Sequence, residues 1–596
     1  MREYTTPAVV EEPTSGSLSD PVWENASTHP DSAVFSRRTA DGWSDVTAAE
    51  FKDQVVAVAK GLIAAGVQHG DRVALLSPTR YEWTLVDYAI WSIGAATVPI
   101  YETSSPSQIQ WILTDSEAVA AVVESGVHAT AVENARAEAP ALQEIWQLES
   151  GAIDQLTALG ADVSDAELDK RRAAVTPSDL ATLIYTSGTT GRPKGCKLTH
   201  ANFLSELRTA VKVLDDLFVL DGASTLLFLP LAHVFARIIQ VGCVMMRVRL
   251  GHTADVKNLV ADLGTFKPTF ILSVPRVFEK VFNTASQTAH SAGRGKIFDA
   301  AAETAIEYSQ KLSDGGVGLG LRVRHGIYDK LVYGKLRAVL GGQASYAVSG
   351  GAPLGDRLGH FFRGIGVPVL EGYGLTETTA ALAVNLPGGI RIGTVGKPLP
   401  GVTVAVADDG ELLFKGGQVM AGYWKNDEAT AAAIDADGWF HSGDLGDVDA
   451  DGYIRITGRK KEILVTAGGK NVAPAALEDR IRLHPLVSQC MVVGDGKPFI
   501  AALVTIDPET VGAWASEHGK PSDVPSLTDD PDLRAEVQRA IDDANSAVSK
   551  AEAIRKFAIL PNDWTQDNGE LSLKLSLRRH VVMKNHATDI TALYTR

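Results

Sequence analysis

Apolar positions along the N-terminal part of the chain follow two spacings. Apolar side chains recur at helical spacing over residues 48–65 and 83–94. Short, continuous apolar runs occupy residues 72–76, 96–100 and 118–123. Buried strands that alternate with helices are typical of a parallel sheet covered on both faces. The pattern therefore predicts an α/β fold with packed α/β subdomains.

The pattern changes farther along the chain. Residues 283–342 are rich in Ala and helical in spacing, which predicts a helical insertion. Residues 403–414 and 443–456 alternate as paired strands around Asp-Gly turns and predict a β-rich subdomain. A polar junction, GRKKE at residues 458–462, then precedes a smaller unit with both strand and helix patterns. The junction marks the expected domain boundary.

A chain of 596 residues is too long for one ordinary core. We expect a large N-terminal domain over residues 1–460 that binds the substrates. A small, mobile α+β C-terminal domain is expected over residues 461–596. The first 20 residues are rich in Pro, Glu, Ser and Thr and are expected to form a mobile arm.

Composition narrows the class of protein. The net charge of −16 argues against nucleic-acid binding, which depends on Lys and Arg. No apolar run reaches the roughly 18 residues of a membrane span, and the N-terminus lacks the pattern of a secretory signal. The widely spaced Cys196, Cys243 and Cys490 indicate neither a metal site nor a disulfide. A cytoplasmic location is the expectation.

Residues 183–195 read LIYTSGTTGRPKG, an apolar strand end followed by hydroxyl residues and glycines. Glycines let backbone N–H groups approach a ligand, hydroxyls add donors, and a Lys adds charge, all of which suit a polyphosphate. The string is not a Walker A loop, because Gly follows the Lys. A flexible surface loop is the alternative. The candidate ligands are Thr186, Ser187, Gly188, Thr189, Thr190, Gly191 and Lys194.

This string resembles the phosphate-loop signature of the acyl-adenylate-forming superfamily, the AMP-binding enzymes. The superfamily includes acyl-CoA synthetases, luciferases and the adenylation domains of peptide synthetases. Residues 371–378, EGYGLTET, resemble its second ATP motif. The resemblance implies that Tyr373 stacks on adenine, that Thr376 donates to the α-phosphate, and that Glu377 binds Mg²⁺. Thr186 is a second candidate metal ligand.

Other nucleotide contacts follow from the same resemblance. Residues 349–354, SGGAPL, are implied to line the adenine pocket, although alone they would be only a turn that ends a strand. The candidates in these two motifs are Gly350, Gly351, Ala352, Pro353, Glu371, Gly372, Tyr373 and Gly374. Asp444 follows a Ser-Gly turn and is implied to accept both ribose hydroxyls. Its alternative role is to cap that turn.

Residues 457–474 read TGRKKEILVTAGGKNVAP. The resemblance places Arg459 near the ribose or phosphate and Lys461 at the hinge, while a solvated charge run is the alternative. It also implies that a loop lines the pantetheine channel of CoA. The residues of this loop are Gly468, Gly469 and Lys470.

Two further candidates complete the predicted site. His233, in LPLAHVFAR, is either a core histidine or, as the resemblance implies, a neighbour of the carboxylate and pyrophosphate. The superfamily uses one Lys near the C-terminus, but in ELSLKLSLRR its expected position holds Ser576, and Lys574 lies two residues earlier. Two residues restore the same face of an extended segment, so Lys574 is the candidate catalytic lysine.

The resemblance extends in particular to long-chain fatty-acyl-CoA synthetases, through LPLAHVFAR, SVPRVFE and KKEILVTAGGKNVAP. It implies that ATP activates a fatty acid as its adenylate and that CoA takes the acyl group. Transfer to a carrier protein and a catalytically degraded nucleotide-binding relative remain alternatives. A fatty substrate is compatible with peripheral membrane contact, but the sequence offers no clear basic amphipathic helix and no oligomeric state.

Overall fold

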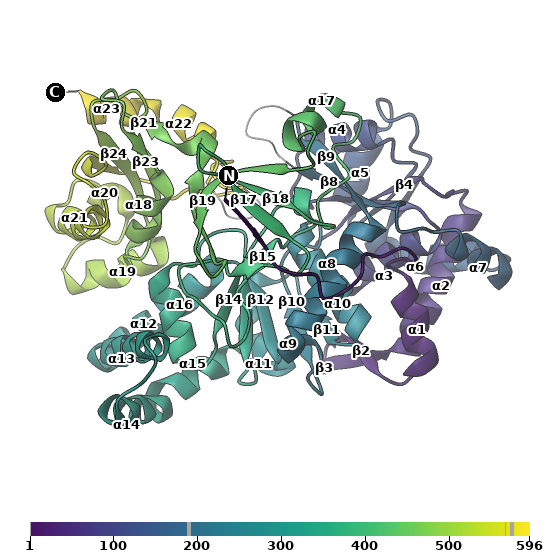
Figure 1. Ribbon diagram of the computed structural model, residues 1–596, viewed down its shortest axis with the longest axis horizontal. Helices are drawn as coiled ribbons and strands as arrows, with labels where there is room; N and C mark the ends of the chain where they lie inside the picture. Colours follow the sequence, from purple (N-terminus) through teal and green to yellow (C-terminus); the bar gives the residue numbers. More distant parts are fainter. Residues whose placement is uncertain (1, 187–191, 567, 573–576, 596) are drawn as a thin grey trace.

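The computed structural model describes residues 2–186, 192–566, 568–572 and 577–595, and Figure 1 shows their arrangement. Within these ranges, four sheets of four to six strands precede residue 460. A smaller group of strands and helices follows and lies at one end of the molecule (Figure 1).

The first α/β layer is a six-stranded sheet in the order β7-β6-β4-β5-β8-β9. Its strands are β4 (Arg72–Leu76), β5 (Ala96–Ile100), β6 (Ala120–Val123), β7 (Glu144–Gln147), β8 (Leu180–Thr186) and β9 (Lys194–Thr199). The pairs β4–β5, β4–β6, β5–β8 and β6–β7 are parallel, and β8–β9 is antiparallel. The prediction of a mainly parallel sheet is confirmed.

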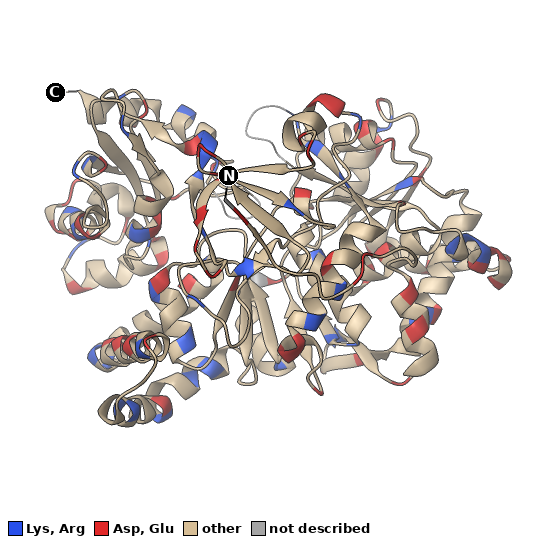
Figure 2. Ribbon diagram, viewed as in Figure 1, with Lys and Arg blue, Asp and Glu red and all other residues tan. Residues whose placement is uncertain are grey.

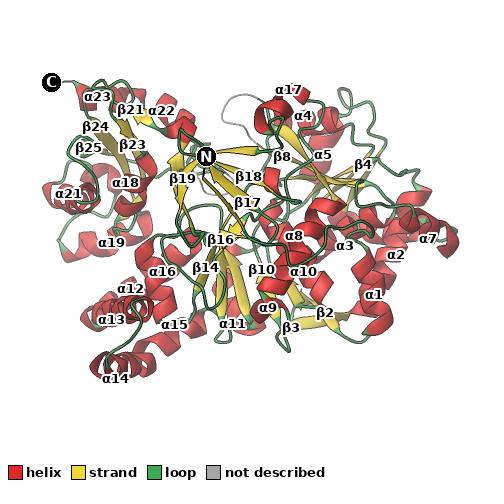
Figure 3. Ribbon diagram, in the orientation of Figure 1, coloured by secondary structure: helices red, strands yellow, loops and turns green. Residues whose placement is uncertain are grey.

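Helices cover both faces of this sheet (Figure 3). Val73 and Leu75 of β4 pack in the cluster that contains α2 (Ala48–Ala64) and α3 (Tyr81–Ser92). Ala74 and Leu76 point the other way, into the cluster of α4 (Pro106–Ser116) and α5 (Gly126–Ala135). Because both faces are buried, the strands read as continuous apolar runs. Three further helices in this part are α1 (Asp20–Thr28), α6 (Ala152–Leu159) and α7 (Asp165–Ala173).

A second α/β layer contains two more sheets. One has the order β12-β13-β14-β15-β16 and the other the order β10-β11-β2-β3. The strands are β2 (Ala33–Thr39), β3 (Gly42–Thr47), β10 (Ser224–Leu227), β11 (Arg249–His252), β12 (Phe270–Ser273), β13 (Tyr346–Ser349), β14 (Val369–Tyr373), β15 (Ala383–Val384) and β16 (Lys397–Pro398). The helices of this layer are α8 (His200–Val213), α9 (Asp215–Phe218), α10 (Val234–Met246), α11 (Leu259–Phe266) and α16 (Asp356–Gly364).

A helical segment joins β12 to β13. It consists of α12 (Pro275–Ser291), α13 (Gly295–Ser313), α14 (Leu319–Tyr328), a π-helical turn at Asp329–Tyr333 and α15 (Gly334–Val339). Phe278, Phe298 and Tyr333 are buried and anchor this segment to α16 and β14 through a shared apolar cluster. The segment occupies one lower corner of the molecule (Figure 1).

The β-rich part is a five-stranded antiparallel sheet in the order β1-β17-β18-β19-β20. Its strands are β1 (Arg2–Thr5), β17 (Thr403–Val406), β18 (Glu411–Lys415), β19 (Phe440–Val448) and β20 (Ile454–Arg459). The helix α17 (Asp427–Ala433) lies between β18 and β19 in the chain.

The presence of β1 corrects one prediction. The first residues were expected to form a mobile arm, yet β1 pairs in antiparallel register with β17. Tyr4 packs partly buried against the main apolar cluster, and a Cβ on Gly452 would lie 2.1 Å from its ring. Backbone hydrogen bonds and the partial burial of one aromatic ring therefore order a segment that its composition predicts to be mobile.

The chain after residue 460 contains a short hairpin and a three-stranded sheet, β23-β24-β25. The strands are β21 (Leu464–Val465), β22 (Asn471–Val472), β23 (Val487–Val493), β24 (Ile500–Ile506) and β25 (Ile554–Ile559). The helices are α18 (Pro474–Ile481), α19 (Pro508–Glu517), α20 (Val524–Leu527), α21 (Pro531–Asn545), α22 (Arg579–Asn585) and α23 (Ala587–Tyr594). Polar contacts link α12 to this part: Lys280 Nζ lies 3.0 Å from Glu509 Oε1.

Candidate nucleotide and acyl site

The phosphate-loop motif joins two strands of the first sheet. Thr186, at the end of β8, lies opposite Lys194, at the start of β9. Both residues line a cavity of about 3010 Å³, and Lys194 Nζ lies 5.0 Å from the centre of the Tyr423 ring. The hairpin thus directs both ends of the motif to the cavity. The candidates Ser187, Gly188, Thr189, Thr190 and Gly191 lie outside the described residues.

The second motif turns sharply after β14 and also lines the cavity. Thr376 begins a 3-10 turn that ends at Thr378. A Cβ on Gly374 would lie 1.4 Å from the carbonyl oxygen of Ala380, so only glycine fits there. The Tyr423 hydroxyl donates to Glu377 Oε1 at 2.8 Å. The turn therefore holds Thr376 and Glu377 at the cavity wall.

The two glycine-containing motifs lie side by side because β13 and β14 are parallel. Ser349 is in register with Glu371, so the turn at residues 350–353 leaves the sheet beside the EGYG segment. Glu371 Oε1 accepts a hydrogen bond from the Leu354 N–H at 2.9 Å. Burial raises the pKa of Glu371 to about 7. Gly350, Gly351, Ala352, Pro353, Glu371, Gly372, Tyr373 and Gly374 all line the cavity.

Three candidates that are distant in sequence meet at the β-rich sheet. The Tyr373 hydroxyl donates to Asp444 Oδ2 at 2.6 Å, and Arg459 Nε lies 3.0 Å from Asp444 Oδ1. Asp444 and Arg459 are paired across β19 and β20. Burial raises the pKa of the Asp444 carboxyl, although the Arg459 guanidinium opposes this shift. The structure thus brings the aromatic, acidic and basic candidates together at one edge of the cavity.

His233 is the residue immediately before α10 and lines the same cavity. Its Nδ1 accepts a hydrogen bond from the Phe235 N–H at 3.1 Å, which caps the helix. Farther along α10, the buried Arg237 donates to Asp87 Oδ2 of α3 at 2.9 Å and to Thr182 Oγ1 of β8 at 2.6 Å. One hydrogen-bond network therefore joins α10, which follows His233, to β8, which ends at Thr186.

The C-terminal candidates are only partly at the cavity. Lys461 lines it from the 3-10 turn after β20. Gly468, Gly469 and Lys470 do not; they form the exposed turn between β21 and β22. Lys574 lies outside the described residues, but Ser572 and Leu577 on either side of it in sequence line the cavity.

Sequence reasoning did not select Tyr423 or Glu411. Tyr423 contacts Glu377 and Lys194. The only sequence feature that could have indicated it is the aromatic pair in GYWK, which matches no specific motif. Glu411 accepts hydrogen bonds from the Gly443 N–H and from Lys460 Nζ, both at 2.9 Å, and so fixes the turn before Asp444. Neither partner is near in sequence, so no local pattern identifies these roles.

The described residues contain no cluster of three or more His, Cys, Asp or Glu side chains suited to a metal. Mg²⁺ commonly uses one or two carboxylates and takes its other ligands from substrate phosphates and water. Glu377 and the Thr186 hydroxyl, both at the cavity, fit that arrangement.

One part of the cavity wall is apolar. It is built by α8, α9 and α10, which pack against one another. Its lining residues include Leu207, Ala210, Phe218, Ile238 and Ile239. A wall of this kind suits a hydrocarbon chain.

Sequence profiles of one family match most of the chain. Residues 22–424 match the family described as AMP-binding enzyme, and residues 461–596 match the AMP-binding enzyme C-terminal domain. The long-chain-fatty-acid--CoA ligase FadD15 of Mycobacterium bovis is 52% identical over 601 residues, with 100% of both chains covered. The peroxisomal long chain acyl-CoA synthetase 7 of Arabidopsis thaliana is 30% identical over 94% of this chain and 83% of that protein.

Solved structures agree with these matches at the level of the fold. The anthranilate CoA ligase AuaEII in complex with anthranoyl-AMP superposes with a TM-score of 0.73 at 20% identity, covering 98% of this chain and 99% of that one. The O-succinylbenzoate coenzyme A synthetase of Bacillus subtilis, in complex with ATP and magnesium ion, gives a TM-score of 0.69 at 20% identity, covering 95% and 99%. The expected fold class is confirmed.

Proposed function

The chain belongs to the AMP-binding enzyme family, and from this premise we propose that it is an ATP-dependent long-chain fatty-acid CoA ligase. One observation carries the proposal. A single cavity is lined by Thr186 and Lys194 of the phosphate-loop motif, by the Tyr373–Asp444 pair and by an apolar wall. ATP and CoA are the co-substrates, Mg²⁺ is the metal cofactor, and a fatty acid supplies the acyl group. The name and full-length similarity of the FadD15 relative support the same assignment.

In the first step, a carboxylate oxygen of the fatty acid attacks the α-phosphorus of ATP, and the bond to pyrophosphate breaks. Negative charge accumulates, so donors and positive charge lower the barrier. We assign the leaving pyrophosphate to the β8–β9 hairpin with Lys194, and the α-phosphate to Thr376. Glu377 and the Thr186 hydroxyl would hold Mg²⁺, which would supply positive charge to the phosphates. His233 lies beside the reacting carboxylate.

In the second step, the thiol of CoA attacks the acyl carbonyl carbon, and the mixed anhydride breaks to release AMP. The two steps need different groups at one place, which favours a mobile C-terminal unit. We propose that residues 461–596 form this unit, with its hinge at Lys461. The exposed turn of Gly468, Gly469 and Lys470 is then the part that moves in to line the CoA channel.

Lys574 is the proposed lysine that holds the acyl carboxylate and the α-phosphate in the first step. Lys574→Ala should lower adenylate formation at least 100-fold, because it removes a positive charge from the reacting centre. Lys584→Ala, in α22, is the matched control and should retain parental activity. Adenylate formation within a few-fold of the parent in Lys574→Ala would show that another residue has this role.

The function itself is tested by pyrophosphate release with a panel of fatty acids of increasing chain length, in the presence of ATP and Mg²⁺. Release that depends on the fatty acid, followed by CoA-dependent AMP release, is the expected result. Parallel assays with free CoA and with an acyl carrier protein separate the ligase from a carrier-loading enzyme. No release with any acid would indicate a nucleotide-binding relative without activity.

We also propose that the protein contacts membranes peripherally, since its substrate partitions into bilayers. Among the described residues, no helix combines the length and apolarity that crossing a bilayer requires.

A further inference from the structure

An unusual row of apolar side chains lies on the outer surface of α14 and the turn that follows it. Leu319, Val323, Ile327 and Leu331 are 79%, 58%, 53% and 55% exposed. They are spaced four residues apart, so they share one side of the helical segment. Single exposed apolar residues are ordinary, but a continuous stripe of four marks an interaction surface. We call these four residues the α14 stripe.

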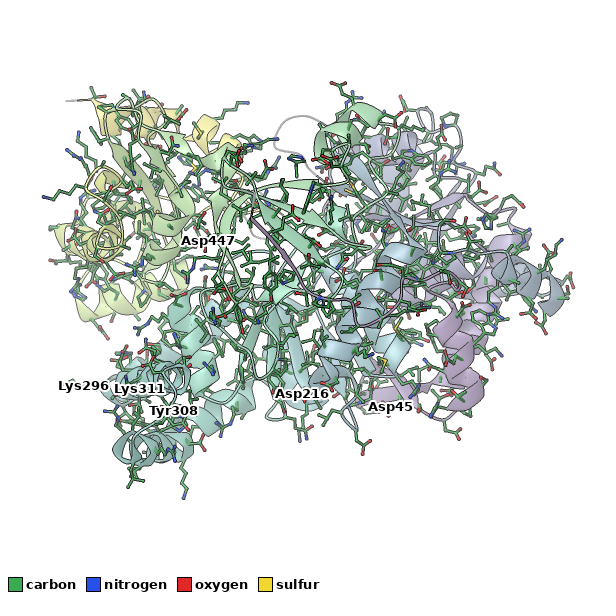
Figure 4. The ribbon with its side chains drawn as sticks, in the orientation of Figure 1. Asp45, Asp216, Lys296, Tyr308, Lys311 and Asp447 are labelled. Atoms are coloured by element: carbon green, nitrogen blue, oxygen red, sulfur yellow. The ribbon has the colours of Figure 1, made fainter. Side chains whose placement is uncertain are left out.

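The opposite side of α14 holds the helix on the protein. His325 Nε2 lies 2.7 Å from the carbonyl oxygen of Gly364, and its ring stacks on Tyr308 at 3.9 Å. Tyr328 packs against the apolar cluster of α12, α13 and α16. The stripe therefore faces away from the body, at the lower corner where Figure 4 labels Tyr308 and Lys311 of α13 and Figure 1 labels α14.

The segment that carries the stripe is basic, although the whole protein is acidic. Residues 319–337 contain five Lys or Arg and one Asp, a net charge of +4, whereas the whole chain carries −16. Arg324 pairs with Glu307, and Arg337 pairs with Asp329. Arg322, Lys330 and Lys335 are exposed and have no ion-pair partner among the described residues. Figure 2 shows Lys and Arg along this corner together with Asp and Glu.

The stripe lies next to an edge of the substrate cavity. Glu303, Ile306, Glu307 and Gln310 of α13 line the cavity, and α14 packs on α13. Glu303 is exposed at this edge, and Glu307 pairs with Arg324 of α14. A surface that binds a bilayer here would hold the cavity edge near the lipid.

We propose that the α14 stripe and its basic neighbours form the surface that docks this protein on anionic lipid bilayers, so that a fatty acid enters the cavity at α13 from the membrane. The inference deepens, and rests on, the proposed action on fatty acids. Apolar side chains enter the acyl boundary while Lys and Arg contact anionic headgroups. A second copy of the chain is a poorer occupant, because the exposed Arg322, Lys330 and Lys335 of two copies would repel one another. The helix has 10 residues, about 15 Å, which suits a position along the interface.

The test is co-sedimentation of the full chain with vesicles of phosphatidylcholine, with and without phosphatidylglycerol. We expect at least tenfold stronger partitioning onto the anionic vesicles, weakened by salt. Val323→Asp/Ile327→Asp and, separately, Arg322→Glu/Lys330→Glu/Lys335→Glu should each lower partitioning at least tenfold. Val127→Asp, at a site 78% exposed on α5, is the matched control and should bind as the parent does. Parental binding by both stripe and charge variants, or no binding by the parent, would overturn the proposal.

Two further measurements keep the result unambiguous. Pyrophosphate release is measured without vesicles, with a fatty acid that the parent accepts, supplied below its critical micelle concentration. It should be unchanged in every variant, so loss of docking is separated from loss of the proposed function. Sedimentation velocity without vesicles tests the other occupant: a parental dimer that the stripe variant abolishes would assign the surface to a second copy and overturn the proposal. Leu319→Ser, at the exposed start of α14, replaces the double variant if the latter fails to fold, and should lower partitioning at least threefold.

Discussion

Gly374 shows how one residue constrains the second ATP motif. Gly374→Ala places a methyl group 1.4 Å from the backbone oxygen of Ala380. The clash is with the backbone, so it cannot be relieved by rotating a side chain. We expect a destabilisation of about 1–3 kcal/mol and at least a tenfold weaker affinity for ATP, because the turn carrying Thr376 must shift. Chemical denaturation and ATP titration measure both. Gly316→Ala, where nothing lies within 4 Å, is the control, and equal behaviour of the two variants would contradict the argument.

Glu206, a buried residue of α8, links pH to stability. Its Oε1 accepts from the Ala381 N–H at 2.9 Å, and burial raises the pKa of its carboxyl well above the usual 4.5. Above pH 4.5 the folded protein retains a proton that the unfolded chain loses, so this group lowers stability by up to about 1.4 kcal/mol per pH unit until the folded-state pKa is reached. Glu206→Gln removes that loss and keeps the acceptor for Ala381.

The Glu206→Gln variant should therefore gain stability relative to the parent as the pH rises from 4.5 to 6.5. Urea denaturation at several pH values measures the difference. Glu303→Gln, with an exposed side chain, should show a nearly constant difference from the parent. A constant difference for Glu206→Gln as well would refute the pH assignment.

At the scale of elements, the buried Asp87–Arg237 pair joins α3, α10 and β8. Both side chains are fully buried, and Arg237 also lies over the Trp83 and Trp91 rings. Arg237→Met should cost about 3–5 kcal/mol, because it leaves Asp87 buried without its cation. Asp87→Leu/Arg237→Met should recover much of this loss, since no uncompensated charge remains. Denaturation followed by tryptophan fluorescence measures both variants, and strictly additive losses would argue against the pair.

At the scale of the whole molecule, the proposed two-step reaction depends on rotation at Lys461. Lys461→Pro fixes φ at the hinge and restricts the residue before it. Adenylate formation should remain measurable while thioester formation falls at least tenfold. Lys461→Ala, which removes the charge but leaves φ free, is the control and should retain both steps. Pyrophosphate and acyl-CoA are measured separately, and equal loss of both steps in Lys461→Pro would count against alternation.

Much of the fold could be predicted because the spacing of apolar residues within each helix or strand indicates its type. The runs at residues 72–76 and 96–100 are β4 and β5, and the Asp-Gly turns after Asp408 and Asp449 join the predicted strands. The site was predictable only as separate motifs, since each motif is local. Their partners were not: Tyr423 reaches Glu377 across 46 residues, and Glu411 reaches Gly443 across 32.

Local sequence patterns predicted a hydroxyl- and glycine-rich loop, a second motif that contains an acidic residue, and alternating strands and helices. These properties depend on neighbouring residues and their spacing. Three features became visible only in the folded chain: β1 pairs with β17, Tyr373 contacts Asp444, and the α14 stripe faces outward. A row of apolar residues at helical spacing has the same period whether it is buried or exposed. Which outcome occurs depends on packing between distant segments, which no local pattern encodes.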